Sequence, residues 1–374
     1  MKIRCAVIGI GSMGKKYALM IDGGKINSLE LVAVCCRSDD NVNWAKNNLN
    51  SSIKIYRNED EMYNDLSSFD AVLIVTPHKL HPAMTIRALK ANKHVMCDKP
   101  AGITFSDAEK INAVANNTDK VFAMMCHQRT YEYYKKIKEL LNKNEIGEIT
   151  RVSMENSNYF RTEYYHHSAN WRSSWNGEGG GALINQGYHL LDMWQYLFGL
   201  PQEIYANIPF GKYNNFDVDD EATIIMNYPN KMTGSFILST GEASLIERLE
   251  IVGTKGRISL NEKTLTITYF SDDIKNYSKE AKVTSRQELN MAFKQYKYDD
   301  PEKPYEIMLN NFADAILKGD KLIAPGIDSS NTLTLVNASY LSAWQGKKVS
   351  LPLDSNEYLK YLHEKEKQEI SKGE

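Results

Sequence analysis

The 374-residue sequence lacks any large imbalance of charge. Its 45 lysines and arginines nearly match its 47 aspartates and glutamates, so the formal net charge is -2. There is no basic surplus of the kind that attracts nucleic acid, and no cationic amphipathic segment of the kind that binds a membrane surface. We therefore expect neither nucleic acid nor a membrane as a partner.

Long apolar runs and disulfide-type cysteine spacings are also missing. No run approaches the length that spans a bilayer, and the N-terminal MKIRCAVIGIGSMG has too short an apolar stretch for a signal peptide. The five cysteines form no CxxC pair, and four of them lie in apolar runs, where cysteine behaves as a small hydrophobe. This usage predicts a reducing, cytoplasmic location. The cysteines are Cys5, Cys35, Cys36, Cys97 and Cys126.

The first third of the chain alternates short apolar runs with helix-like segments. These runs are apolar on both faces, which is typical of a parallel sheet covered by helices. The pattern predicts a doubly wound α/β domain over residues 1–126. Its expected strands are 3–10, 29–36, 71–76, 94–97 and 121–126.

After residue 126 the pattern changes. Segments 149–160 and 221–239 alternate polar and apolar residues, which predicts antiparallel strands with one exposed face. An apolar helix is expected between them at 181–199, and two more at 305–317 and 328–345. The polar segment 271–300 is expected to be a loop or an edge element. We expect a second domain over 127–352 and a charged C-terminal tail over 353–374.

A glycine motif follows the first strand directly. Gly9, Gly11 and Gly14 form GxGxxG between this strand and a helix-like segment. In such a loop the glycines permit a tight turn, close approach of a pyrophosphate, and packing of the helix on the strand. The free N–H groups of the helix start favour the phosphates. We therefore expect Gly9, Gly11, Ser12, Met13 and Gly14 to bind a dinucleotide.

Two further strands end in polar residues and a proline. One ends in TPHKLHP and the other in HVMCDKP. His78 and His81 resemble a metal pair, but no third ligand lies nearby in the sequence, so we expect no metal site. A loop at the cofactor rim is the better interpretation. Thr76, Pro77, His81, Asp98 and Lys99 are the candidate cofactor contacts at these strand ends.

The apolar helix at 181–199 carries a polar stripe. Asn185 and His189 are four residues apart and share a face, with Asp192 three residues further on. A histidine in an apolar helix is more often a packed core residue than a catalyst. The run Gly179–Gly181 before the helix lets the backbone approach a ligand or another strand closely.

Three separated motifs together resemble the glucose–fructose oxidoreductase and inositol dehydrogenase family, Gfo/Idh/MocA. They are GIGSMG, TPHKLHPAMTIRALKANKHVMCDKP and GGGALINQGYHLLDMW, and the resemblance extends to about residue 350. It implies a Rossmann domain followed by an α/β domain with a large, mostly antiparallel sheet. It also implies NAD(P)-dependent oxidation or reduction of sugars and polyols, as in levoglucosan dehydrogenase-like members.

The resemblance also implies catalytic residues. The family's Glu-Lys-Pro motif reads Asp98-Lys99-Pro100 here, so Lys99 is expected beside the nicotinamide and the substrate hydroxyl, with a cis bond before Pro100 as an option. His189 matches a catalytic histidine next to that lysine. Asn185 stands where the family most often has aspartate, and we expect it to bind substrate or to orient His189.

The segment 159–175 concentrates aromatic and basic residues. Their flat faces and polar tips suit sugar rings, although aromatic residues also dominate packing clusters and interfaces. From this stretch Tyr165, Trp171 and Arg172 are taken as substrate contacts, and Arg129 is a further candidate after the last Rossmann strand.

The end of the second strand bears on cofactor choice. Cys36 stands where the family often has an aspartate that grips the ribose diol of NAD. Arg37 and Ser38 suit a 2′-phosphate, which predicts a preference for NADP over NAD. Two alternatives remain open: Arg37 stacks on adenine, which would favour neither cofactor, or Asp39 or Asp40 reaches the ribose and restores NAD binding.

The sequence thus predicts an enzyme that transfers a hydride between nicotinamide and a ring carbon of a sugar, glycoside or cyclic polyol. His189 would act as the base and Lys99 would stabilise the alkoxide. The alternatives are a dinucleotide-binding regulator without turnover and a nucleotide-sugar dehydrogenase, for which no basic cluster is evident in the second domain. The resemblance suggests a homodimer or homotetramer.

Overall fold

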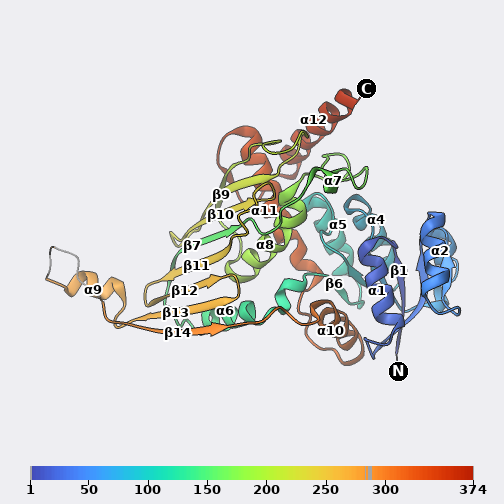
Figure 1. The fold of residues 1–374 in the computed structure, drawn as a ribbon, viewed down its shortest axis with the longest axis horizontal. Helices are drawn as coiled ribbons and strands as arrows, with labels where there is room; N and C mark the ends of the chain where they lie inside the picture. Colours follow the sequence, from blue (N-terminus) through green and yellow to red (C-terminus); the bar gives the residue numbers. More distant parts are fainter. Residues whose placement is uncertain (1, 283, 285–288, 374) are drawn as a thin grey trace. The chain divides into compact units, whose positions relative to one another are not determined.

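The computed structural model describes residues 2–282, 284 and 289–373 (Figure 1). Contacts within the chain divide it into two compact units, which interleave along the sequence. Unit 1 comprises Met1–Thr130, Gly177–Gly179 and Lys303–Thr334, and unit 2 comprises Tyr131–Asn176, Gly180–Glu302 and Leu335–Glu374. The three domain ranges expected from the sequence run in chain order and stay a prediction.

Unit 1 is built on a parallel sheet of six strands in the order β3-β2-β1-β4-β5-β6. This is the strand order of the Rossmann fold. The five strands expected in the first third are all present, while β3 is only three residues long and was missed. The strands are β1 (Ile3–Ile8), β2 (Leu29–Cys35), β3 (Lys54–Tyr56), β4 (Ala71–Ile74), β5 (His94–Cys97) and β6 (Phe122–Met124).

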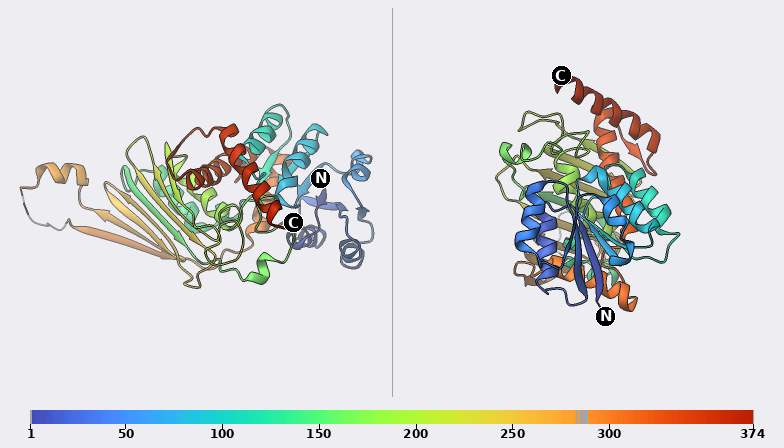
Figure 2. Two further views of the ribbon diagram at one scale, coloured as in Figure 1. Left: turned by 90° about the horizontal axis from the view of Figure 1, so that it is seen from above. Right: turned by 90° about the vertical axis from the view of Figure 1, so that its right-hand side faces the viewer.

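Helices lie on either side of this sheet, as the right-hand view of Figure 2 shows. They bury the faces of strands such as β4, whose four residues are all buried. The predicted doubly wound α/β architecture is therefore confirmed. The helices are α1 (Ser12–Asp22), α2 (Asp39–Asn48), α3 (Glu59–Tyr63), α4 (His81–Lys90), α5 (Phe105–Ala115) and α10 (Pro304–Lys318), with short 3₁₀ turns at Leu66–Ser68, His78–Leu80, His127–Thr130 and Gly326–Asp328.

The segment 303–334 belongs to unit 1 because it covers the free edge of β6. The backbone N–H of Met124 donates to the carbonyl of Ala324 at 3.0 Å, and Ala123 forms an antiparallel bridge with Pro325. Tyr305 of α10 stacks on His127 with ring centroids 4.7 Å apart. An edge strand that is paired in this way no longer presents open backbone groups.

Unit 2 contains a nine-stranded sheet in the order β14-β13-β12-β11-β7-β10-β9-β8-β15. Only the pairing of β7 with β10 is parallel, so the predicted large, mostly antiparallel sheet is confirmed. The left-hand view of Figure 2 shows these strands side by side. They are β7 (Ile149–Asn156), β8 (Glu203–Asn207), β9 (Glu221–Asn227), β10 (Thr233–Ser239), β11 (Glu247–Gly253), β12 (Gly256–Asn261), β13 (Thr264–Phe270), β14 (Met291–Lys297) and β15 (Val349–Ser350).

The apolar helix α8 packs on one face of this sheet. A Cβ at Gly187 of α8 would collide with Leu238 of β10, and a Cβ at Gly234 of β10 would collide with the ring of Trp194. Helix and strand therefore lie as close as their backbones allow. The helices of this unit are α6 (Glu132–Asn142), α7 (Glu163–His166), α8 (Ala182–Phe198), α9 (Ile274–Glu280) and α12 (Ser355–Gly373), and α11 (Ser329–Gln345) continues into it from unit 1.

The charged C-terminal tail expected at 353–374 is largely formed by helix α12. Helix α12 buries Tyr358 and Leu362. The carboxylate of Glu369, near its end, accepts hydrogen bonds from the backbone N–H groups of Trp175 and Asn176 at 2.9 and 3.0 Å. The polar segment 271–300 contributes α9 and the exposed edge strand β14, which agrees with the expected edge element. No helix among the described residues has the length and apolar character needed to cross a bilayer.

Candidate dinucleotide and substrate sites

The glycine loop has the geometry that a dinucleotide requires. Gly9 has a φ of +95°, and a Cβ on Gly14 would overlap the carbonyl group of Gly9. Helix α1 starts at Ser12 with Gly11 as its N-cap, and no side chain caps it. A Cβ on Gly11 would meet nothing within 4 Å. The loop thus leaves backbone N–H groups and open space where a pyrophosphate would bind.

His81 joins the loops that follow β4 and β5. Its Nε2 lies 2.6 Å from the carbonyl oxygen of Thr76, and its Nδ1 lies 2.6 Å from that of Pro100. Burial lowers the pKa of His81, whereas the two carbonyl groups and Asp98 favour the charged ring. Because His81 is 1% exposed, these contacts hold the two loops together from inside, and a cofactor contact of His81 stays a prediction.

Asp98 and Lys99 follow β5 directly. The Asp98 carboxylate accepts the backbone N–H of Lys99 at 2.8 Å and the hydroxyl of Tyr17 at 3.5 Å. Burial raises the pKa of Asp98, and the charges of Lys99 and His81 oppose this rise. The Lys99–Pro100 peptide bond is cis. The shorter aspartate therefore still has partners in this chain, and Lys99 lies half-buried at the carboxyl end of β5.

The corner after β2 holds more positive charge than the sequence indicated. Arg57, just after β3, donates to the carbonyl of Arg37 at 3.0 Å and forms an ion pair with Asp39. This pairing lowers the pKa of Asp39. The Ser38 hydroxyl accepts the N–H of Asn41 as the N-cap of α2. Sequence reasoning missed Arg57, since only the pairing of β3 with β2 brings it here.

In unit 2, Asn185 and His189 form a half-exposed stripe on α8. All other residues of α8 from 182 to 193 are buried, including Asp192. The start of α8 is capped by Asp219, whose carboxylate accepts from the N–H groups of Gly181 and Leu183 at 2.8 and 2.6 Å. The close approach expected at Gly179–Gly181 is therefore to protein, because a Cβ on Gly181 would overlap the Asp219 backbone.

Tyr165 connects the aromatic stretch to α8. Its hydroxyl oxygen receives N–H donors from Arg172 at 2.8 Å, Asn185 at 3.1 Å and Gln186 at 3.2 Å. The Arg172 guanidinium also lies over the Trp171 ring, 4.8 Å from its centroid. Four predicted substrate contacts, Tyr165, Trp171, Arg172 and Asn185, thus form one cluster in unit 2.

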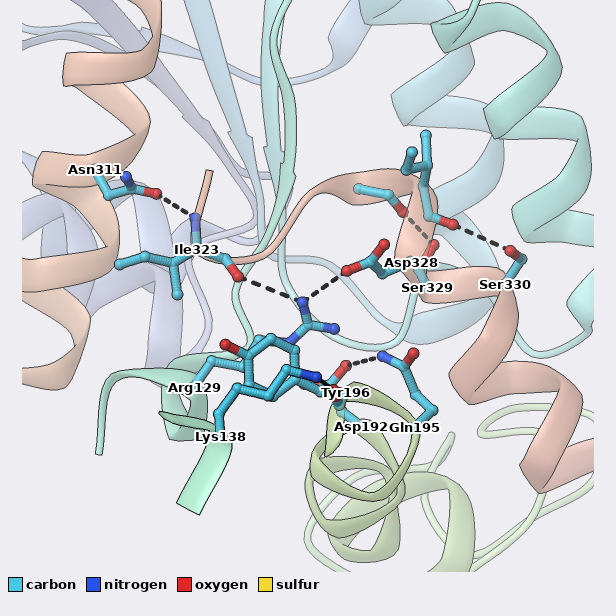
Figure 3. Close-up of polar contacts among 12 residues, drawn as sticks. Arg129, Lys138, Asp192, Gln195, Tyr196, Asn311, Ile323, Asp328, Ser329 and Ser330 are labelled. Atoms are coloured by element: carbon cyan, nitrogen blue, oxygen red, sulfur yellow. Dashed lines mark hydrogen bonds and ion pairs between the residues drawn. The ribbon is translucent and has the colours of Figure 1, made fainter. Parts of the chain in front are cut away.

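Arg129 has a different environment. Its side chain is 1% exposed, and its guanidinium points to Asp328 at 2.7 Å and to the carbonyl of Ile323 at 3.4 Å (Figure 3). These contacts attach the segment after α10 to the last Rossmann strand, which is a structural role. A substrate role for Arg129 stays a prediction.

Comparison with known proteins identifies the family. The sequence profile described as "Oxidoreductase family, NAD-binding Rossmann fold" matches residues 3–127, and the profile of the "GFO/IDH/MocA C-terminal domain" matches residues 134–259. Together they extend over well more than half of the chain. The protein belongs to the Gfo/Idh/MocA oxidoreductase family. It is thus an oxidoreductase with an NAD(P)-binding Rossmann fold, as the resemblance implied.

Individual relatives are distant. Trans-1,2-dihydrobenzene-1,2-diol dehydrogenase of Bos taurus is 25% identical over 263 residues, covering 70% of this chain and 74% of that protein. Myo-inositol 2-dehydrogenase of Thermotoga maritima is 24% identical over 281 residues, covering 71% and 78%. The structure of levoglucosan dehydrogenase with NADH and L-sorbose superposes with a TM-score of 0.76 at 20% identity, covering 94% of this chain and 99% of that one, and shares its fold.

Two glycine variants separate the structural and binding roles of the loop. Gly14→Ala should destabilise unit 1 by about 1–3 kcal/mol, because the methyl group overlaps the Gly9 backbone. Gly11→Ala meets no protein atom within 4 Å, so its melting temperature should stay unchanged. Its dinucleotide affinity should fall about 10-fold, since the methyl group occupies space that the pyrophosphate approaches.

Thermal melting and NADPH fluorescence titration check both variants. Unchanged dinucleotide affinity in Gly11→Ala would refute the assignment of this loop as the pyrophosphate site.

Proposed function

We propose that this protein oxidises or reduces a CH–OH group on a ring carbon of a sugar, glycoside or cyclic polyol, using NAD(P). The observation that carries the proposal is the position of Lys99. It follows β5, which lies two strands from β1 and its glycine loop in the same parallel sheet. The similarity to diol, inositol and levoglucosan dehydrogenases supports a substrate with ring hydroxyl groups.

The roles of the two proposed catalytic residues follow from their chemistry. The nicotinamide, when bound, accepts the hydride from the ring carbon or returns it. His189 takes the hydroxyl proton as the carbonyl forms and gives it back in the reverse direction. Lys99 stabilises the negative charge that develops on the oxygen. Asn185, one helical turn before His189, binds substrate or orients the histidine.

A regulator without turnover and a nucleotide-sugar dehydrogenase remain the alternatives. Hydride exchange with any free sugar or polyol, measured as nicotinamide absorbance at about 340 nm, excludes the regulator without turnover. Turnover of a free monosaccharide at rates matching those of its nucleotide-linked form excludes the need for a nucleotide.

Replacement of the two proposed catalytic residues tests the mechanism. Lys99→Met and His189→Asn should each lower kcat by about 10²–10⁴-fold, because each removes a proton-transfer or charge-stabilising group. The exposed pair Lys110→Met and His363→Asn serve as matched controls and should keep normal kcat. Steady-state kinetics on the best substrate of a screen provide the measurement. Near-normal kcat in Lys99→Met would refute this mechanism.

We also propose that NADP(H) is preferred over NAD(H). The carboxylate of Asp39 is engaged by Arg57, and Cys36 carries no charge that would repel a phosphate. Arg37 supplies a guanidinium group at this corner, which the contact of Arg57 with its carbonyl helps to position, and Ser38 supplies a hydroxyl. Such groups favour a 2′-phosphate over a bare ribose diol.

Dissociation constants for both cofactors test this preference. Arg37→Gln should weaken NADPH binding by about 10- to 100-fold, the equivalent of a lost hydrogen bond to a charged group. NADH binding should change by less than about 3-fold, since its ribose lacks the phosphate. Arg4→Gln is the control, because Arg4 lies at the amino end of β1, where it pairs with Asp70. Equal or tighter NADH binding by the unmodified protein would contradict the proposal.

A homodimer or homotetramer formed through unit 2 is the proposed assembly. Tyr205 and Ile225 lie opposite each other on β8 and β9, and Ile237 lies on β10. All three are 38–43% exposed, on the sheet face that alternates with the one packed against α8. An apolar group of this kind favours association.

Light scattering coupled to gel filtration tests the assembly. The protein should elute as an oligomer at micromolar concentration, and Ile225→Lys should dissociate it because the charge would be buried at the interface. Ile370→Lys on α12, also at an exposed apolar residue, should leave the mass unchanged. A monomeric mass for the unmodified protein would rule out the proposal.

A further inference from the structure

Two arginines in unit 2 lie over the same tyrosine ring. The guanidinium carbon of Arg161 is 4.7 Å from the Tyr165 ring centroid, and that of Arg172 is 4.6 Å from it. Only Glu163–His166 of the stretch between them is helical, so the turns on either side of α7 also help to bring the two guanidinium groups to the ring. The folding of the 159–175 segment around α7 therefore concentrates positive charge at one aromatic ring.

Tyr165, with the two arginines over its ring, contacts the polar stripe that Asn185 and His189 form on α8. The Tyr165 hydroxyl oxygen accepts from Arg172, and it also accepts from the side-chain amide of Asn185, one turn before His189. The contacts are side chain to side chain within one unit. A substrate group bound by the arginines would thus lie close to Asn185 of the same unit.

Arg161 carries a charge that the protein does not neutralise. Among the described residues no carboxylate lies within ion-pairing distance of it, whereas Arg151 pairs with Glu250 and Arg248 pairs with Glu155. The one hydrogen bond of its guanidinium among these residues runs from Nη1 to the Phe160 carbonyl at 3.2 Å, and the buried Nε has no partner there.

A buried acid, Asp220, lies in the same neighbourhood. Asp220 influences the neighbouring His166 electrostatically, as do both arginines. One of its oxygens, however, accepts the backbone N–H groups of Tyr213 and Asn214 at 2.8 and 3.0 Å. The other oxygen, Oδ1, is buried and has no hydrogen-bond partner among the described residues. No ion pair joins it to Arg161 there, so the Arg161 guanidinium has no bonded carboxylate in the described part of the chain.

We infer that the substrate carries an anionic group, a carboxylate or a phosphate, and that Arg161 binds it beside Arg172 and Tyr165. The inference rests on the proposed function and narrows it to acidic derivatives of sugars or polyols. A guanidinium donates two parallel hydrogen bonds to either anion, and stacking on tyrosine holds the planar group in place before binding. A neutral hydroxyl would not compensate the charge.

Matched substrate pairs test the inference. Steady-state kinetics should compare glucose with glucuronate and with glucose 6-phosphate, and galactose with galacturonate, using NADP⁺ and NAD⁺. The acidic member of at least one pair should have a kcat/KM about 10-fold or more above its neutral partner. The glucuronate and phosphate arms distinguish a carboxylate from a phosphate ligand.

Arg161 variants assign the effect to this residue. Arg161→Gln should lower kcat/KM for the acidic substrate by about 10- to 100-fold, mainly through KM, and Arg161→Lys should recover part of it. The neutral partner should change by less than about 3-fold, because it makes no charged contact. Arg151→Gln, on the exposed side of β7, is the control and should behave as the unmodified protein. Unchanged melting temperatures exclude misfolding.

The outcomes separate the two proposals. If neutral sugars react as well as acidic ones and Arg161→Gln leaves their ratio unchanged, the anionic substrate is refuted while the dehydrogenase proposal stands. If no carbohydrate supports hydride transfer, the dehydrogenase proposal fails. Fluorescence of Trp171, titrated with glucuronate and with inorganic phosphate, then decides the anion site: saturable binding lost in Arg161→Gln supports it, and no binding refutes it.

Discussion

The parallel alignment of β1, β4 and β5 is the constraint on which the dinucleotide site depends. Residues at the carboxyl ends of parallel strands meet at one edge of the sheet, however far apart they are in sequence. The glycine loop, Thr76 and Lys99 follow these three strands in turn. A change of register would carry each of them away from the others, so the site is a consequence of the sheet before it is a property of any single motif.

Buried hydrogen bonds then fix the positions of the loops. His81 and Asp219 lie in the interior, where an unsatisfied polar atom is costly, and both bond to backbone groups. His81 bridges the carbonyl groups of Thr76 and Pro100, and Asp219 caps the first turn of α8. Each orients a segment whose neighbouring side chains are ligand candidates, and a cofactor contact of His81 itself stays a prediction.

Unit 2 combines a general scaffold with a particular set of charges. The family profile extends over α8 and the strands from β7 to β11, and the levoglucosan dehydrogenase structure shares the fold. Such a scaffold supports many substrates, so it identifies the reaction class but not the molecule. The arginines around Tyr165 lie outside the apolar packing of α8 on β10, and it is at such positions that members of one fold differ in specificity.

The sequence alone determined the local features of this protein. Apolar runs and GxGxxG predicted the Rossmann strands and the loop after β1, and the i, i+4 spacing predicted that Asn185 and His189 share a face. These patterns succeed because they depend on neighbours within a few residues. The register of β3 that brings Arg57 to Arg37, the capping of α8 by Asp219, the return of segment 303–334 to the edge of β6, and the meeting of Arg161 with Arg172 over Tyr165 were decided only by the tertiary structure. The first three join residues that are far apart in sequence and meet through the packing of whole elements. The last depends on the irregular turns around α7, which no simple periodicity describes.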